Sequence, residues 1–295
     1  MSRSEQLGSV REVAVAGGTI RYRERGEGQP VLFVHGLLVN GDLWRGVAPR
    51  VAEAGYRCIA PDLPLGSHEL PMNSDADLTP PALARTIVEL IDNLGLERPI
   101  LVGNDTGGAL TQLVMAEQPD KLGPVVLTSC DAFEHFFPPL FRYLSVTARM
   151  PGAAFMLAQT MRIKPAQRMP IAFGWLTRER QPPEIMESYL RPVMGSSAVR
   201  RDLTKFLRNV NRKFTLAAAE KLPNFEQPVL LAWGDDGRVF PIEDAKRLAE
   251  VLPNAQLEIV RDSRAFVPED QPEELARLVV DFANRSARRR STQPA

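Results

Sequence analysis

The 295-residue sequence has few cysteines and few histidines. Its two cysteines, Cys58 and Cys130, lie in or at the end of apolar runs, and the sequence has no CxxC motif and no Cys/His cluster. These features argue against a disulfide framework and against a zinc site. We therefore expect two buried free thiols, no metal and no cofactor.

The sequence also lacks an excess of charge, because 36 basic side chains balance 36 acidic ones. Nothing in that balance favours nucleic acid or an anionic membrane as a partner. The stretch MSRSEQLGSVREV lacks the apolar segment of a signal peptide, and no apolar run is long enough to span a bilayer. We expect a cytoplasmic chain that binds a small apolar molecule, and the oligomeric state stays open.

The sequence does contain a regular alternation of strand-like and helix-like segments. A hairpin is predicted over 10–26, around the turn pair Gly17-Gly18. Further strands are predicted at 31–36, 56–64, 100–103, 124–129, 229–234 and 257–260, and helices at 43–54, 78–96, 107–118, 243–252 and 272–283. This order predicts an α/β fold with a mostly parallel central sheet covered by helices on both faces.

The stretch 132–222 interrupts this alternation, since it is rich in phenylalanine and methionine and shows no clear strand. We interpret it as a helical lid, with residues 1–131 and 223–295 forming the α/β core. Such an insert would cover the edge formed by the carboxyl ends of the strands, where open α/β sheets bind their ligands.

The motif LVGNDTGGAL, residues 101–110, predicts a functional site at that edge. An apolar strand, a glycine-rich turn and a helix opening with small residues together form the outline of a nucleophile elbow. The central position of such an elbow is usually serine, and here it is Asp105.

Five motifs occur in a characteristic order: VLFVHGLLVNGDLW, PDLP, GNDTGG, AWGDDGRVFP and DSRAFVPEDQPEEL. With these motifs the chain resembles the α/β-hydrolase superfamily over nearly its whole length. Because the elbow carries an aspartate, the chain resembles the branch of this superfamily that contains haloalkane dehalogenases and epoxide hydrolases. The resemblance implies that Asp105 is the nucleophile and that the backbone N–H groups of Leu37 and Thr106 are the oxyanion donors.

A carboxylate at the elbow needs no base for its first step, because it is already ionised at pH 7. The positive end of the following helix would stabilise that charge by up to ~2 kcal/mol. Attack on a saturated carbon would give an alkyl ester of Asp105. In enzymes of this kind a histidine then activates the water that releases the product.

The usual partners of the nucleophile are absent from their expected positions. By the resemblance, the catalytic acid belongs where this chain has Gly237, and the histidine belongs where it has Ala265. This departure puts ordinary hydrolytic turnover in doubt.

Three histidines could in principle replace the missing base. We interpret His35 as a structural part of the His-Gly turn and His135 as an exposed loop residue. His68 lies on a loop that should open toward the catalytic edge, so it is the candidate base, with an ordinary loop histidine as the alternative. Asp131, at the end of a strand, is the candidate acid, and a polar strand cap is its alternative.

The expected substrate follows from the residues around the elbow. By the resemblance, a dehalogenase usually has tryptophan after the nucleophile, where this chain has Thr106, so halide release is disfavoured. Trp175 lies in the lid, where a core role competes with substrate binding. Two lid tyrosines, Tyr143 and Tyr189, could protonate the oxygen of an opening epoxide.

The sequence therefore favours an enzyme similar to epoxide hydrolases, with Asp105 acting on a small apolar electrophile. Two alternatives remain open. Asp105 could act as a general acid or base in an elimination, isomerisation or cyclisation, which needs no activated water. The chain could instead be a small-molecule-binding protein whose catalytic residues have been lost.

Overall fold

The computed structural model describes residues 5–292 of the chain, with side chains described as far as Arg288. It contains an eight-stranded sheet with the order β1-β2-β4-β3-β5-β6-β7-β8. The strands are β1 (Ser9–Val15), β2 (Gly18–Arg25), β3 (Gln29–Val34), β4 (Tyr56–Pro61), β5 (Ile100–Asp105), β6 (Val125–Cys130), β7 (Val229–Gly234) and β8 (Ala255–Val260). The predicted α/β fold is confirmed.

The two halves of the sheet pair differently. β1 pairs with β2 and β2 with β4 in antiparallel register, and β4, β3, β5, β6, β7 and β8 then follow in parallel pairs. Every residue of β5, β6 and β7 is buried. These continuous apolar runs are typical of parallel strands covered on both faces.

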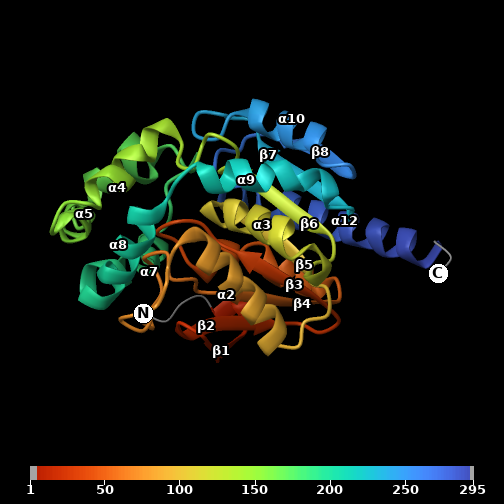
Figure 1. Ribbon diagram of the computed structural model, residues 1–295, viewed down its shortest axis with the longest axis horizontal. Helices are drawn as coiled ribbons and strands as arrows, with labels where there is room; N and C mark the ends of the chain where they lie inside the picture. The colour runs from red at the N-terminus through yellow and green to blue at the C-terminus, as the bar shows by residue number, and fades with distance from the viewer. Residues whose placement is uncertain (1–4, 293–295) are drawn as a thin grey trace.

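Helices cover the sheet on two sides. In Figure 1, α2 (Pro80–Asn93), α3 (Thr106–Glu117) and α9 (Lys213–Lys221) lie in front of the strands, with α3 packed between the other two. On the other side, α1 (Ala48–Glu53) packs against α12 (Pro272–Thr292), and α11 (Val267–Asp270) precedes α12. The helix α10 (Ile242–Val251) packs on β7 and β8.

The predicted helix at 43–54 is shorter than expected. A 3-10 turn covers Gly41–Trp44, and α1 begins only at Ala48. The break follows from Gly46 and Pro49, because proline is accepted in the first turn of a helix and not in its interior. The helix predicted at 78–96 is present as α2, and the Thr79 hydroxyl caps its first turn by accepting a hydrogen bond from the Ala82 N–H.

The segment between β6 and β7 is helical in the structure and contains no strand among residues 132–222. Its helices are α4 (Arg142–Thr147), α5 (Ala153–Thr160), α6 (Lys164–Gln167), α7 (Pro183–Gly195), α8 (Ser197–Asn209) and α9. Figure 1 shows α4 and α5 at the end of the molecule opposite to the end of α12. Since α9 packs on α3, the last part of this segment belongs to the layer that covers the sheet. In the part of the chain that the structure describes, no helix is long and apolar enough to cross a membrane.

Candidate active site

Asp105 lies at the turn between β5 and α3, and its backbone has φ 55° and ψ −132°. This conformation is costly for any residue other than glycine, and such strain is concentrated at functional sites. The pairing of β5 with β6 also shifts register between Asn104 and Asp105. The strand–turn–helix elbow predicted from GNDTGG is therefore present in the backbone.

Two glycines make room for this turn. A Cβ atom on Gly36 would lie 2.6 Å from the Asp105 Cγ atom, and one on Gly107 would overlap the backbone carbonyls of Val34 and His35. Both contacts are far shorter than a carbon atom accepts. The glycines of the His-Gly turn and of the elbow are therefore required for the position of Asp105.

Backbone donors hold the Asp105 carboxyl group. The Thr106 N–H donates to Asp105 Oδ1 over 2.6 Å, and the Leu37 N–H also hydrogen-bonds this carboxyl. These are the two groups for which the sequence predicted the role of oxyanion donors. In the structure they bind the side chain of Asp105 itself, which fixes the orientation of the carboxyl plane.

Burial dominates the electrostatics of Asp105. Removal from water raises the pKa of the Asp105 carboxyl to about 7, and the hydrogen bonds from Thr106 and Leu37 oppose this rise. The group therefore titrates near neutral pH. It can act as a nucleophile when ionised and as a proton donor when protonated.

Asp131 lies next to this site, directly after β6, and is fully buried. The Thr106 hydroxyl bridges the two acids, at 3.3 Å from Asp105 Oδ1 and 3.2 Å from Asp131 Oδ2. Burial, followed by the charge of Asp105, raises the pKa of Asp131 well above its ordinary value. Asp131 Oδ1 has no hydrogen-bond partner in the described part of the chain. The pair is therefore expected to keep a proton at neutral pH, because two buried carboxylates repel each other.

An apolar pocket opens above Asp105, with walls formed by both the core and the lid. Its lining includes Leu37, Leu38 and Phe240 from the core and Phe137, Phe141, Tyr143, Leu157 and Phe173 from the lid segment. Tyr143 and Asp105 bear the only polar side chains among its lining residues, and none of these residues is a histidine. The Tyr143 hydroxyl donates to the Ile171 carbonyl over 2.7 Å. The sequence singled out Tyr143 and missed the phenylalanines, although DAFEHFFPPLF placed several of them at the start of the lid.

The structure does not bring His68 to this pocket. The His68 imidazole is buried against a lid helix, where its Nε2 atom lies 3.2 Å from Asp202 Oδ2. His68 and Asp202 thus join the loop after β4 to α8, a contact with a partner 134 positions away that the local sequence could not reveal. The role of His68 as a base gains no support from its position.

The other two histidines also have partners of their own. His35 Nε2 accepts a hydrogen bond from the Leu63 N–H over 2.8 Å, which suits the structural role expected of it. His135 is half-buried and not an exposed loop residue, because its Nδ1 atom lies 2.5 Å from Asp244 Oδ2 on α10. Neither is among the residues that line the pocket.

Gly237 and Ala265 occupy the two positions where the resemblance places the catalytic acid and the histidine. Both positions lie in loops that structural hydrogen bonds hold in place. Ala265 is buried, and its carbonyl accepts a hydrogen bond from Asn104 Nδ2 over 2.9 Å. In the loop that contains Gly237, Asp235 accepts hydrogen bonds from the Ser263 and Asp262 N–H groups. Asp236 pairs with Arg264 over 3.1 Å. Asp236 also accepts a hydrogen bond from the Arg238 N–H, so both aspartates satisfy backbone donors of their loops.

Two further candidates lie away from the pocket. The Tyr189 hydroxyl donates to Glu269 Oε1 over 2.5 Å, beside Arg45, and is completely buried. Trp175 lies under the Arg238 guanidinium, 5.7 Å from the ring centre. Neither side chain lines the pocket above Asp105. Both side chains make structural contacts here, because a hydrogen bond to Glu269 holds the Tyr189 hydroxyl and the Arg238 guanidinium covers the Trp175 ring.

The family model described as "Alpha/beta hydrolase family" matches residues 31–278. The chain belongs to the alpha/beta hydrolase family. It is 27% identical to Haloalkane dehalogenase 2 of Mycobacterium tuberculosis over 270 residues, which is 90% of this chain and 91% of that protein.

One further relative carries a different activity in its name, while a solved structure carries the haloalkane dehalogenase name again. The chain is 27% identical to the non-heme chloroperoxidase CPO-A1 of Kitasatospora aureofaciens over 277 residues, or 91% of this chain and 97% of that protein. The solved structure of the haloalkane dehalogenase DatA from Agrobacterium tumefaciens C58 superposes with a TM-score of 0.79. That alignment covers 96% of this chain and 99% of DatA at 24% identity, which shows a shared fold and no more.

Proposed function

We propose that this chain is an enzyme in which Asp105 attacks an electrophilic carbon of a small apolar molecule, with an epoxide as the substrate class. The observation that carries the proposal is the Asp105 carboxyl, held by the Thr106 and Leu37 N–H groups on the floor of an apolar pocket. A carboxylate in this position can attack without a base. The resulting ester would keep one oxygen in the same pair of hydrogen bonds.

The polar groups of the pocket favour an epoxide over a halide. A leaving halide needs indole or amide N–H donors, and the lining residues include neither tryptophan nor asparagine. An opening epoxide needs one proton, and Tyr143 lines the same pocket as Asp105. In the proposed step, Asp105 forms a bond to carbon, the carbon–oxygen bond of the ring breaks, and the Tyr143 hydroxyl gives its proton to that oxygen. Water then returns a proton to Tyr143.

Release of the ester should be slow. Ala265 occupies the place where the family carries histidine, and no imidazole lines the pocket. Loss of a positioned base costs about 10²–10⁴-fold in such a step. We therefore expect the ester on Asp105 to accumulate.

The Asp105–Thr106–Asp131 arrangement favours a second candidate, acid–base chemistry without an ester. The Thr106 hydroxyl lies within hydrogen-bond distance of both carboxyl groups, and burial raises the pKa of each. A carboxyl pair that holds one proton can give it to a substrate or take one from it near neutral pH. Such an elimination, isomerisation or cyclisation would need no activated water.

Intact-protein mass spectrometry separates these candidates. The wild type and Asp105→Asn would be incubated with a panel of epoxides and alkyl halides, and products would be assayed in the same samples. We expect a substrate-sized mass gain on the wild type alone, from an epoxide. Conversion to the hydrolysis product without a mass gain would mean that a working base releases the ester, whereas conversion to an isomer or elimination product, lost in Asp105→Asn, would favour acid–base chemistry. Tight binding with neither adduct nor product would overturn both and leave a binding protein.

A further inference from the structure

Large apolar side chains are exposed mainly on one part of the lid. Among the residues that the structure describes, exposed large apolar side chains outside the lid are limited to Val10 and Ile259. The others belong to the stretch 146–171, which forms α4, α5, α6 and the turns around them. We call this group the lid patch, and its members are Val146, Met150, Phe155, Met156, Ile163, Met169 and Ile171. Exposed apolar side chains that gather on one segment in this way mark an interaction site.

The lid patch borders a groove that leads toward Asp105. Met150, Met156, Met169 and Ile171 line this groove, and none of its lining residues is charged. Tyr143, Leu157 and Ile171 are among the residues that line both the groove and the pocket above Asp105. The lid patch therefore surrounds an apolar passage on the outer side of the catalytic pocket.

The charge around the lid patch has a single sign. From residue 135 to residue 178 the sequence contains no aspartate or glutamate. The basic residues in this stretch are Arg142, Arg149, Arg162, Lys164, Arg168 and Arg178, and all of them are exposed. Arg178 pairs with Asp235 and Asp262, while the other five form no ion pair with a described carboxylate. Because the whole chain has no net charge, its composition does not reveal the basic segment 135–178.

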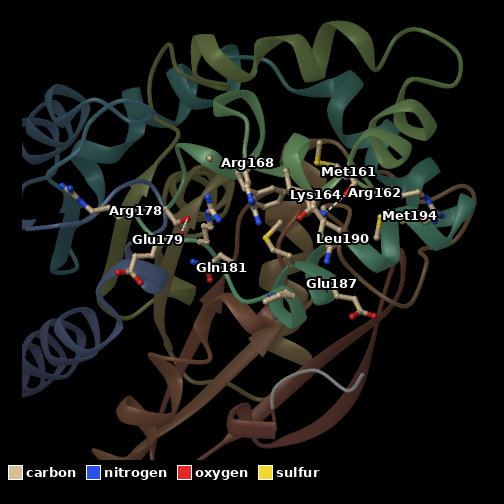
Figure 2. Close-up of a pocket in the computed structure, with 17 residues that line it drawn as sticks. Met161, Arg162, Lys164, Arg168, Arg178, Glu179, Gln181, Glu187, Leu190 and Met194 are labelled. Atoms are coloured by element: carbon tan, nitrogen blue, oxygen red, sulfur yellow. Dashed lines mark hydrogen bonds between the residues drawn. The ribbon is translucent and has the colours of Figure 1, made fainter.

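Part of this basic segment lines a second cleft, shown in Figure 2. Arg162, Lys164 and Arg168 line it beside Met161, and all of its lining residues come from the stretch 161–194. The two acidic side chains of the cleft, Glu179 and Glu187, come from beyond the basic segment. Unpaired cations thus lie next to exposed apolar side chains, which is the arrangement of segments that bind at a membrane interface.

We propose that the lid patch docks on an anionic lipid surface. Its apolar side chains would enter the boundary between headgroups and acyl chains, while the surrounding arginines and Lys164 would bind anionic headgroups. A second copy of this chain fits the patch less well, because a symmetric contact would bring two sets of cations together. This proposal differs from the expectation of no membrane partner, which rested on the charge of the whole chain. It is independent of the chemistry at Asp105, so its test needs no substrate.

Vesicle sedimentation tests the proposal with the full-length chain. We expect the wild type to sediment with phosphatidylcholine vesicles that contain phosphatidylglycerol, to bind much less to phosphatidylcholine alone, and to be released by salt. The double variant Met156→Ser/Ile163→Ser should lower the partition coefficient by roughly tenfold or more, because two inserted side chains are lost. Lys164→Gln/Arg168→Gln should weaken binding to the anionic vesicles only.

Matched controls keep the result specific. Ile259→Ser removes an exposed isoleucine from β8, and Lys246→Gln removes an exposed lysine from α10; both should bind like the wild type. All substituted side chains are exposed, so the variants should keep the melting temperature of the wild type. Failure of the wild type to bind anionic vesicles, or unchanged binding by Met156→Ser/Ile163→Ser, would overturn the proposal. A lipid-free dimer that this double variant abolishes would assign the patch to a second copy instead.

Discussion

The loop after β5 and the loops after β7 and β8 lie along the same edge of the sheet, yet they differ in what their side chains do. After β5, a strained backbone places Asp105 against two N–H donors below an apolar pocket. After β7 and β8, the side chains join the two loops to each other: Asp235 accepts a hydrogen bond from the Ser263 N–H, and Asp236 pairs with Arg264.

This difference separates two parts of the proposed catalytic site. The part around Asp105 is built mainly from backbone geometry, with glycines that leave no room for a side chain. The part that would activate water depends on two side chains, and in this chain those positions are Gly237 and Ala265. The proposed nucleophile is thus in place, while the side chains expected to release its product are missing.

Removing the space around Asp105 should have a large effect. Gly36→Ala would place a Cβ atom 2.6 Å from Asp105 Cγ, so the carboxyl must move. We expect adduct formation to fall by about 10²-fold or more, and stability to fall by about 1–3 kcal/mol from overpacking. Adduct mass against time and thermal unfolding would measure the two effects.

Gly237→Ala is the matched control in the loop after β7. Its added Cβ would have its nearest neighbour, Ile242 N, at 3.3 Å. We expect adduct formation like that of the wild type and a stability change within about 1 kcal/mol. If both glycine variants behaved alike, the contrast between the two regions would be wrong.

Restoring the missing side chains should sharpen the contrast. In Ala265→His/Gly237→Asp, the imidazole would be placed to activate water, and the ester on Asp105 should break down up to about 10²–10⁴-fold faster. Single-turnover decay of the adduct would measure this rate. Because Ala265 is buried, Ala265→Gln serves as the control for size. A well-folded double variant with unchanged ester decay would show that position 265 does not serve Asp105.

The next effect concerns stability and pH. The pKa of the Asp105 carboxyl is about 7 in the folded chain, and its ordinary value is 3.8. Folding therefore takes up a proton between these values, and the wild type should lose stability as pH rises through that window. Asp105→Asn stays neutral, so it should exceed the wild type by roughly 1–4 kcal/mol above pH 7 and match it near pH 4. Denaturant unfolding across this range would measure the difference, and a constant difference would contradict the raised pKa.

The sequence predicted the fold and the elbow well, because both depend on local patterns. Continuous apolar runs gave the parallel strands, and GNDTGG gave the position of Asp105. The partners of His68 and Tyr189 could not be predicted, since Asp202 and Glu269 are far away in the sequence. The bridge from Thr106 to Asp131 also needs the register of β5 and β6, which local patterns do not determine.

The smallest expected effect belongs to the loop after β7. Asp235 accepts two backbone hydrogen bonds and pairs with Arg178, and these contacts outweigh burial and lower the pKa of its carboxyl. Asp235→Asn should cost less than about 1 kcal/mol, because the pair is partly exposed. That cost should be present above pH 4 and fade as pH falls through the lowered pKa. Adduct formation should be unchanged, and a clear loss would give this loop a catalytic role.

The most direct test of the central claim is peptide mapping of the protein after brief exposure to an epoxide that is found to react. We expect the added mass on the peptide that carries Asp105, as an ester that mild alkali cleaves. Its rate of formation should rise with pH through about 7, the pKa of the Asp105 carboxyl. Modification of Cys58, Cys130 or Asp131 in place of Asp105 would contradict the assignment of the nucleophile.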